Sequence, residues 1–331
     1  MKKIINCVQD VVIEMCNGLV KACPEQIEFI EKYKIIKKKV LNKNKVTLIS
    51  GGGSGHEPAH AGYVGTGMLD AAVCGDMFAS PSIIQVYNAI LQTRSEKGTL
   101  LIIKNYSGDC MNFDSAADMA QEEGVKIEKV YVNDDVAVQD SLHTVGRRGV
   151  AGTIFVHKIA GVAAENGMDL LQVKAIAERV IDNVRSIGFA LTSCTVPANG
   201  TPTFDLPDNE IEFGVGIHGE PGIARETIKT ADEIAEKMVA LIVKDLPFKP
   251  EDEAVLMING LGGTPIQELY ILNNSVHNSV KKRGIQIYKT YVGNYMTSID
   301  MAGASVTLLK LDNELKELLD SPVEIPASKF I

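Results

Sequence analysis

The chain has 331 residues, of which 45% are hydrophobic, 23% charged and 5% aromatic, and its formal net charge at pH 7 is -9. At roughly 100 to 200 residues per domain, this length indicates two domains or one large one, and the apolar content excludes a disordered chain. An acidic chain with scattered basic residues lacks the positive surface that nucleic acid requires, so we expect no nucleic-acid partner.

Cysteine spacing and apolar runs indicate the compartment. The six cysteines include no C-x-x-C pair, which favours reduced thiols and argues against a structural zinc site. Asp10 and Glu14 interrupt the first apolar run, and no stretch approaches the roughly 20 apolar residues of a membrane span. We therefore expect a cytoplasmic protein that does not contact a membrane.

Three short apolar runs in the first half, each followed by Gly, Asn or Asp residues, predict buried strands. They lie at residues 46–50, 100–104 and 127–132, and a helix is predicted over 113–123. Strands that alternate with helices indicate βαβ units on a parallel sheet, in which ligands bind at the carboxyl ends of the strands.

The second half also alternates strands and helices. An amphipathic pattern predicts one helix over residues 168–186 that links the halves. We predict two α/β domains, residues 1–186 and residues 187–331, the first with a largely parallel sheet flanked by helices. The strands predicted after the linking helix lie at 189–192, 255–259, 285–291 and 305–310, and the helices at 227–244 and 266–282.

The segment GGGSGHEPAH at residues 51–60 follows the first predicted strand. It does not match the dinucleotide, Walker or nucleophile-elbow patterns, because His56 stands where a glycine is needed and no Lys-Ser or Lys-Thr follows. Its glycines favour a loop whose N–H groups approach a small polar ligand closely, and the alternative is a tight turn from strand to helix.

The same segment satisfies H-E-x-x-H, the zinc protease pattern, at His56 and His60. That pattern requires both histidines on one face of a continuous helix, whereas Pro58 is tolerated only in a first turn. We therefore expect His56 before a helix and His60 inside it. A zinc-dependent hydrolase stays an alternative of low weight.

Lys104 and Asp109 follow the second predicted strand, at the sheet edge that also carries His56. Asp109 is a candidate base for a substrate hydroxyl, and the alternative is that it caps the following helix.

His218 lies between glycines in a second glycine-rich segment. An accessible imidazole can form a hydrogen bond, ligate a metal ion or add to a carbonyl carbon as a nucleophile. A lone histidine, however, is more often structural than catalytic. Glu220 could orient the ring, and Arg147 and Arg148 are candidates for an anion or partner contact.

Five segments contain these features: SGGGSGHEPAHAGYVG at 50–65, KNYSGDCMNF at 104–113, RRGVAGT at 147–153, GVGIHGEPG at 214–222 and GNYMTSIDMAG at 293–303. In this order, over nearly the whole chain, they resemble the substrate-binding subunits of dihydroxyacetone kinase. The resemblance implies that His218 forms a covalent hemiaminal with the substrate ketone, and that Asp109 and His56 are the acid and base around the phosphorylated hydroxyl. It also implies that Gly53, Ser54, Gly55 and Lys104 hold the triose, and that the chain forms a homodimer.

No segment resembles a nucleotide-binding loop. By resemblance, this is the phosphoenolpyruvate-dependent type, a phosphotransferase that acts on glycerone. In that type no cofactor or metal binds this chain, ADP and magnesium belong to a separate kinase subunit, and a phosphotransferase-system phosphocarrier protein rephosphorylates that subunit. The family also contains regulators that bind the triose without catalysis. Those regulators can lose the carboxylate at position 109, so the presence of Asp109 predicts a catalytic subunit.

Overall fold

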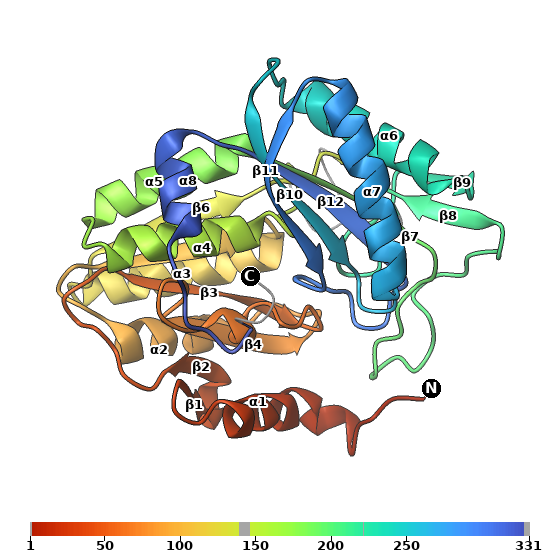
Figure 1. The fold of residues 1–331 in the computed structure, drawn as a ribbon. Helices are drawn as coiled ribbons and strands as arrows, with labels where there is room; N and C mark the ends of the chain where they lie inside the picture. Colours follow the sequence, from red (N-terminus) through yellow and green to blue (C-terminus); the bar gives the residue numbers. More distant parts are fainter. Residues whose placement is uncertain (1, 139–145, 221, 328–331) are drawn as a thin grey trace.

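The computed structural model describes residues 2–138, 146–220 and 222–327, which form two six-stranded sheets with helices around them (Figure 1). The α/β fold is confirmed. In the first sheet the order is β1-β2-β4-β3-β5-β6, and β4, β3, β5 and β6 are parallel. Its strands are β1 (Ile27–Ile30), β2 (Ile35–Lys38), β3 (Thr47–Ser54), β4 (Ala71–Met77), β5 (Thr99–Lys104) and β6 (Ile127–Val132).

The second sheet has the order β11-β10-β12-β7-β8-β9, and only β10 and β11 are parallel. Its strands are β7 (Val184–Ala190), β8 (Glu210–Phe213), β9 (Ala224–Thr227), β10 (Glu253–Gly260), β11 (Gln286–Gly293) and β12 (Gly303–Lys310). The helices of the chain are α1 (Val11–Ala22), α2 (Ile83–Thr93), α3 (Ser107–Glu122), α4 (Thr153–Glu165), α5 (Leu170–Asn183), α6 (Ala231–Asp245), α7 (Ile266–Lys282) and α8 (Asn313–Asp320), with short 3-10 turns η1 (Val8–Asp10), η2 (Glu31–Tyr33) and η3 (Ala61–Tyr63).

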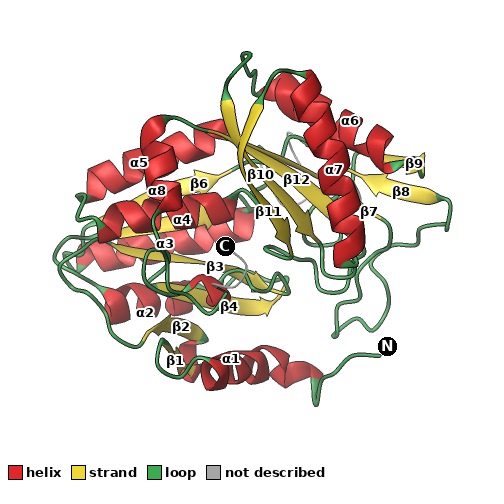
Figure 2. Ribbon diagram, viewed as in Figure 1, coloured by secondary structure: helices red, strands yellow, loops and turns green. Residues whose placement is uncertain are grey.

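The two sheets share one apolar core. Helices α2 and α3 cover one face of the first sheet, and α6 and α7 cover the outer face of the second (Figure 2). Along β10 the side chains alternate: Leu256 packs toward α6 and α7, whereas Val255 and Met257 pack in the cluster that contains α4, α5 and α8. Successive side chains of a strand point to opposite faces, so this alternation is expected for a strand whose sheet is covered on both faces.

The structure changes several predicted boundaries. The helix predicted over 168–186 ends at Asn183, because the next residues pair with β12 and form β7. The helix predicted from residue 227 begins at Ala231, because Thr227 pairs with Glu210 in the sheet. In both places long-range strand pairing overrides a local helical pattern.

The end of the chain returns to the first half. Helix α8 packs with α4 in one cluster, and Thr66 exchanges backbone hydrogen bonds with Glu324. The predicted domain division after residue 186 stays a prediction, and the segment 313–327 contributes to the core of the first half.

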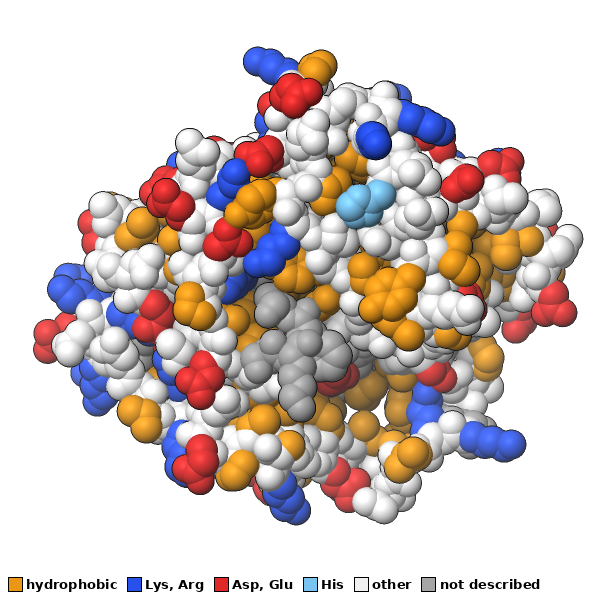
Figure 3. Space-filling model, viewed as in Figure 1, with side chains coloured by type: hydrophobic (Ala, Val, Ile, Leu, Met, Phe, Trp, Pro, Cys, Tyr) orange, Lys and Arg blue, Asp and Glu red, His pale blue; other side chains and the backbone are white. Residues whose placement is uncertain are grey.

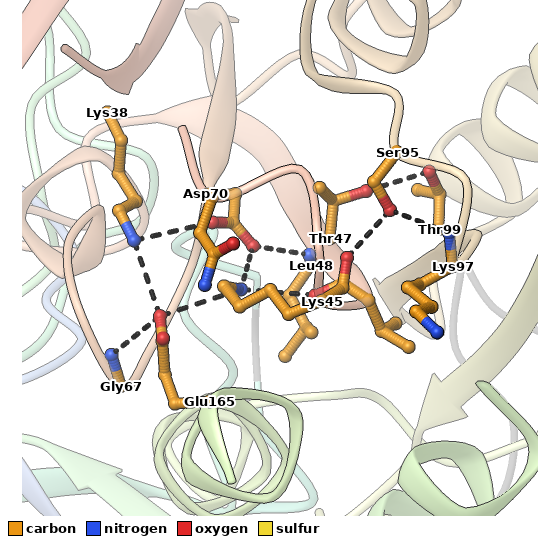
Figure 4. Close-up of polar contacts among 12 residues, drawn as sticks. Lys38, Lys45, Thr47, Leu48, Gly67, Asp70, Ser95, Lys97, Thr99 and Glu165 are labelled. Atoms are coloured by element: carbon orange, nitrogen blue, oxygen red, sulfur yellow. Dashed lines mark hydrogen bonds and ion pairs between the residues drawn. The ribbon is translucent and has the colours of Figure 1, made fainter. Parts of the chain in front are cut away.

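A buried ion network joins β2, β4 and α4 at the edge of the first sheet where its parallel strands begin (Figure 4). The Lys45 ammonium lies 2.6 Å from the Asp70 carboxylate, and both side chains are at most 2% exposed. Lys38 lies 3.3 Å from Glu165 at the end of α4, and the Leu48 N–H donates to Asp70. The network therefore holds α4 at the sheet end opposite to the predicted ligand edge.

Charged side chains of both signs are interspersed on the face shown in Figure 3. In the part of the chain that the structure describes, no helix is long and apolar enough to cross a bilayer.

Gly161 of α4 packs against backbone, because a Cβ there would lie 2.5 Å from the Gly67 oxygen and the Met68 Cα. Gly161→Ala is expected to lower the free energy of unfolding by about 1 to 2 kcal/mol, since overpacking outweighs the gain in helix propensity. Gly18→Ala in α1 is the matched control: a Cβ there meets no atom within 4 Å, so stability should rise by about 0.5 to 1 kcal/mol. Urea unfolding measures both, and an unchanged Gly161→Ala midpoint would contradict the predicted clash.

His157 of α4 is buried, and burial followed by the Lys104 charge lowers its pKa to about 3. Between that pH and the ordinary pKa near 6.5, the unfolded chain binds a proton that the folded chain excludes, so this group destabilises the fold as pH falls. Relative to His157→Leu, the wild type should lose about 2 kcal/mol of unfolding free energy between pH 7.5 and 5. His277→Leu is the control, because His277 is only half-buried. If the unfolding free energies of wild type and His157→Leu changed in parallel with pH, protonation of His157 would not be linked to stability.

Candidate functional site

A cavity of about 350 Å³ opens at the carboxyl ends of the parallel strands, where the sequence predicted the ligand edge. Three predicted site residues, Gly53, Asp109 and His218, line it. Five further residues complete the lining: Phe78, Ser80, Tyr106, Ser107 and Gly108.

Asp109 lies inside the first turn of α3, which begins at Ser107. The alternative that Asp109 caps this helix is therefore wrong. Its Oδ2 atom is 3.3 Å from the Lys104 ammonium, and Oδ1 is buried with no hydrogen-bond partner among the described residues. A Cβ at Gly52 would lie 2.4 Å from the Lys104 nitrogen, so this glycine makes room for the buried pair. The free carboxylate oxygen is suited to accept a proton or hydrogen bond from a ligand.

His56 is buried behind the cavity, with Nδ1 2.8 Å from the Thr297 carbonyl oxygen. A carbonyl only accepts, so Nδ1 carries the hydrogen and Nε2 keeps its lone pair. Burial and then the Lys104 charge lower the pKa of His56 to about 3, although the Thr297 contact acts in the opposite direction. The ring is therefore neutral near pH 7, with an acceptor nitrogen that has no partner among the described residues.

His218 lies in the segment between β8 and β9 and is surrounded by rings. Its centroid is 4.4 Å from Tyr106, 4.8 Å from His56 and 5.4 Å from Phe78, each in an edge-on arrangement. Glu220 Oε1 lies 3.9 Å from His218 Nδ1. This separation is longer than a hydrogen bond, so Glu220 acts through its negative charge, which favours a proton on the Nδ1 side of the ring over one on Nε2.

The glycine-rich segment also packs closely against the neighbouring segment that carries Phe78. Strand β3 continues through Gly53, where a Cβ would lie 2.7 Å from the Phe78 backbone, and a Cβ at Gly55 would lie 2.8 Å from the Phe78 ring. The Ser54 hydroxyl donates to Gly75, also on the neighbouring segment. The absence of side chains at Gly53 and Gly55 thus lets the segment that carries Phe78 pack against β3. Ser54 and Gly55 themselves do not line the cavity.

The H-E-x-x-H residues do not form a helix. His60 precedes the short turn η3 instead of lying inside a helix, so that prediction is wrong. Its Nδ1 is 3.3 Å from Ser50, and its ring packs near His157, whereas the His56 ring stacks on Phe78. The helical geometry that zinc would require is therefore not formed. Over residues 2–138, 146–220 and 222–327, no group of three or more His, Cys, Asp or Glu could hold a metal ion.

The two arginines have internal partners. Arg147 forms a bidentate pair with Asp245. Arg148 is 1% exposed and its guanidinium contacts Asp135 and Glu220. The expectation that Arg148 meets an external anion or partner is therefore wrong.

Sequence analysis missed the aromatic part of the site. Phe78 adopts a left-handed backbone conformation with φ of 56°, which is uncommon for a bulky residue. No local pattern marks such a position. Tyr106 belongs to the second motif, but its contact with His218 joins the start of α3 to the segment between β8 and β9, far apart in the sequence. Thr297 likewise comes from the turn between β11 and β12, where Ile299 also donates to Gly55.

Comparison of the sequence with known proteins shows the family of this chain. Residues 17–327 match the family model described as the Dak1 domain. The chain is 50% identical over 325 residues to the PTS-dependent dihydroxyacetone kinase 1, dihydroxyacetone-binding subunit DhaK, of Listeria innocua. That alignment covers 98% of this chain and 99% of the relative.

Solved structures of relatives share the fold. The dihydroxyacetone kinase of C. freundii matches with a TM-score of 0.90 and 38% identity, over 98% of this chain and 60% of that longer one. The dihydroxyacetone kinase operon co-activator Dha-DhaQ also matches with a TM-score of 0.90, at 35% identity, over 96% of this chain and 97% of the co-activator. The fold is thus shared by a kinase and by a protein described as an operon co-activator.

Proposed function

Because this chain belongs to the Dak1 family of dihydroxyacetone kinases, we propose that it is the dihydroxyacetone-binding catalytic subunit of a phosphotransferase-system type kinase. The observation that carries the proposal is that His218 and Asp109 line one small cavity, with the His56 ring centroid 4.8 Å from that of His218. A triose has too few atoms for tight noncovalent binding, since each non-hydrogen atom contributes at most about 1.5 kcal/mol. A covalent bond to the protein offsets that limit.

In the proposed capture step, the Nε2 lone pair of His218 adds to the carbonyl carbon of dihydroxyacetone. The C–N bond forms as the C=O π electrons move to oxygen. That oxygen gains a proton and Nδ1 loses one, so a neutral hemiaminal results. Glycerol has no carbonyl and is excluded by reactivity. Gly53, Ser54, Gly55 and Lys104 belong to the proposed triose-binding residues, of which Gly53 supports this most directly because it lines the cavity.

The bound triose then presents a terminal hydroxyl for phosphoryl transfer. Asp109 and His56 form the proposed acid and base pair around it. Both present buried acceptor atoms without described partners, so either can take up the hydroxyl proton as a base and then return it as an acid. Holding the nucleophile in line supplies much of the catalysis in phosphoryl transfer. ADP and magnesium would belong to a separate kinase subunit, rephosphorylated by a phosphocarrier protein, and this chain would act as a homodimer in the cytoplasm.

A triose-binding regulator is the second candidate, because the co-activator shares the fold over nearly its whole length. The Asp109 carboxylate in the cavity lining favours catalysis, since a protein that only senses the triose needs no base there.

The decisive experiment for capture uses dihydroxyacetone labelled with ¹³C at the carbonyl carbon. On binding, its NMR signal should leave the ketone region and appear where sp³ carbons with two heteroatoms resonate. A ketone signal that stays unchanged in a saturated complex would overturn covalent capture. Phosphorylation of the triose in the presence of the kinase subunit separates the catalytic subunit from the regulator.

A further inference from the structure

A buried chain of charges links the first half of the molecule to the segment that carries His218. The Arg148 Nε atom donates to Asp135 at 2.7 Å, and Nη1 lies 3.3 Å from Glu220 Oε2. Glu220 Oε1 is in turn 3.9 Å from His218 Nδ1. The order along this chain is therefore Asp135, Arg148, Glu220 and the imidazole.

Arg148 also holds the backbone of the same segment. Its Nη2 atom donates to the Gly214 carbonyl at 2.8 Å, at the start of the segment that leads to His218. A Cβ at Gly216 would lie 2.7 Å from Arg148 Nη1 and 2.8 Å from Glu220 Oε2. This glycine therefore permits the guanidinium and the carboxylate to meet beneath the loop.

The ion pair between Arg148 and Glu220 is buried, so a substituted side chain has little room to find other partners. The Arg148 side chain is 1% exposed and the Glu220 side chain 10%. A planar guanidinium donates in several fixed directions, so one side chain can bind Asp135, Glu220 and a carbonyl at once. A lysine ammonium is a compact charge without this fork, and it cannot reproduce the three contacts together.

We propose that Arg148 is a positioning residue for His218, which acts through Glu220 to set the direction of the imidazole. The proposal rests on the proposed function, because it assumes that His218 captures the substrate carbonyl. Arg148 holds Glu220 Oε2, so that Oε1 faces Nδ1. Before attack, the negative charge of Glu220 favours the proton on Nδ1 and the lone pair on Nε2. During attack, the positive charge that develops on the ring lies beside a carboxylate until Nδ1 releases its proton.

The test compares Arg148→Lys with Arg147→Lys as a matched control. Arg147 is the adjacent residue in the sequence and also forms an ion pair, but its partner is Asp245 rather than the His218 segment. Glu220→Gln is the second variant, because it leaves the pair between Arg148 and Asp135 intact. Circular dichroism and thermal melts establish that each variant is folded.

We expect kcat/KM with the kinase subunit to fall roughly a hundredfold in Arg148→Lys, since a small misplacement of a reacting group has an effect of that size. The ¹³C adduct signal should weaken in parallel, while Arg147→Lys retains both. The double variant Arg148→Lys with Glu220→Gln should lose no more than the larger single effect, because both changes break one pathway.

The outcomes separate the two proposals. An adduct that is absent from the wild type overturns the proposed capture and the role of Arg148 together. A wild-type adduct that persists in folded Arg148→Lys and Glu220→Gln overturns only the positioning role. Additive losses in the double variant would also overturn it, since Arg148 would then act independently of Glu220. If Arg148→Lys is unfolded, an unchanged adduct in folded Glu220→Gln is sufficient to reject the proposal.

Discussion

His218→Asn is expected to remove covalent capture of dihydroxyacetone and to lower phosphorylation by about three orders of magnitude. Asparagine resembles the imidazole in size but has no nucleophilic lone pair, because its amide nitrogen is conjugated. The triose would then be held only by hydrogen bonds in a cavity of about 350 Å³. Because capture both retains the substrate and orients its terminal hydroxyl, its loss should raise KM and lower kcat together.

The ¹³C adduct signal and the coupled phosphorylation assay measure this prediction. The control is His277→Asn, because His277 lies on α7 and contacts Thr290, away from the cavity lining. It should retain both signals. If His218→Asn formed the adduct and turned over at the wild-type rate, His218 would not be the capturing residue.

Asp109→Asn should separate binding from catalysis. The amide keeps the shape of the carboxylate but cannot take a proton, and removal of a general base costs about 10²- to 10⁴-fold in rate. The substitution also replaces the charged partner of Lys104, 3.3 Å away. His218 is unchanged, so the adduct should still form while phosphoryl transfer falls.

The control for Asp109→Asn is Asp114→Asn on the same helix. Asp114 pairs with Lys129 and is partly exposed, outside the cavity lining, so the rate should stay within about twofold of wild type. A kcat of Asp109→Asn equal to that of wild type would show that the reaction needs no base at this position. A different group would then accept the proton of the hydroxyl.

Local sequence patterns predicted the strands, the helices and the sheet edge that carries part of the site. Strands β5 and β6 and helix α7 lie where hydrophobic periodicity placed them, because burial of one face imposes a regular spacing. It also placed Lys104, Asp109 and the glycine-rich segment at one sheet edge, since parallel strands present their carboxyl ends together. Gly53 and Asp109 therefore meet at the cavity, to which packing of the second sheet adds His218.

Only the tertiary structure decided how that site is supported. The tautomer of His56 depends on the Thr297 carbonyl, 241 residues away in the chain, and the Arg148 side chain turned inward to Asp135 and Glu220 instead of outward. Local periodicity carries no information about such partners, because each contact forms only when two separately folded segments pack together. The amino-acid sequence thus determined which chemical groups are present and at which sheet edge most of them lie. Long-range packing determined their hydrogen-bond partners, their burial and hence their protonation.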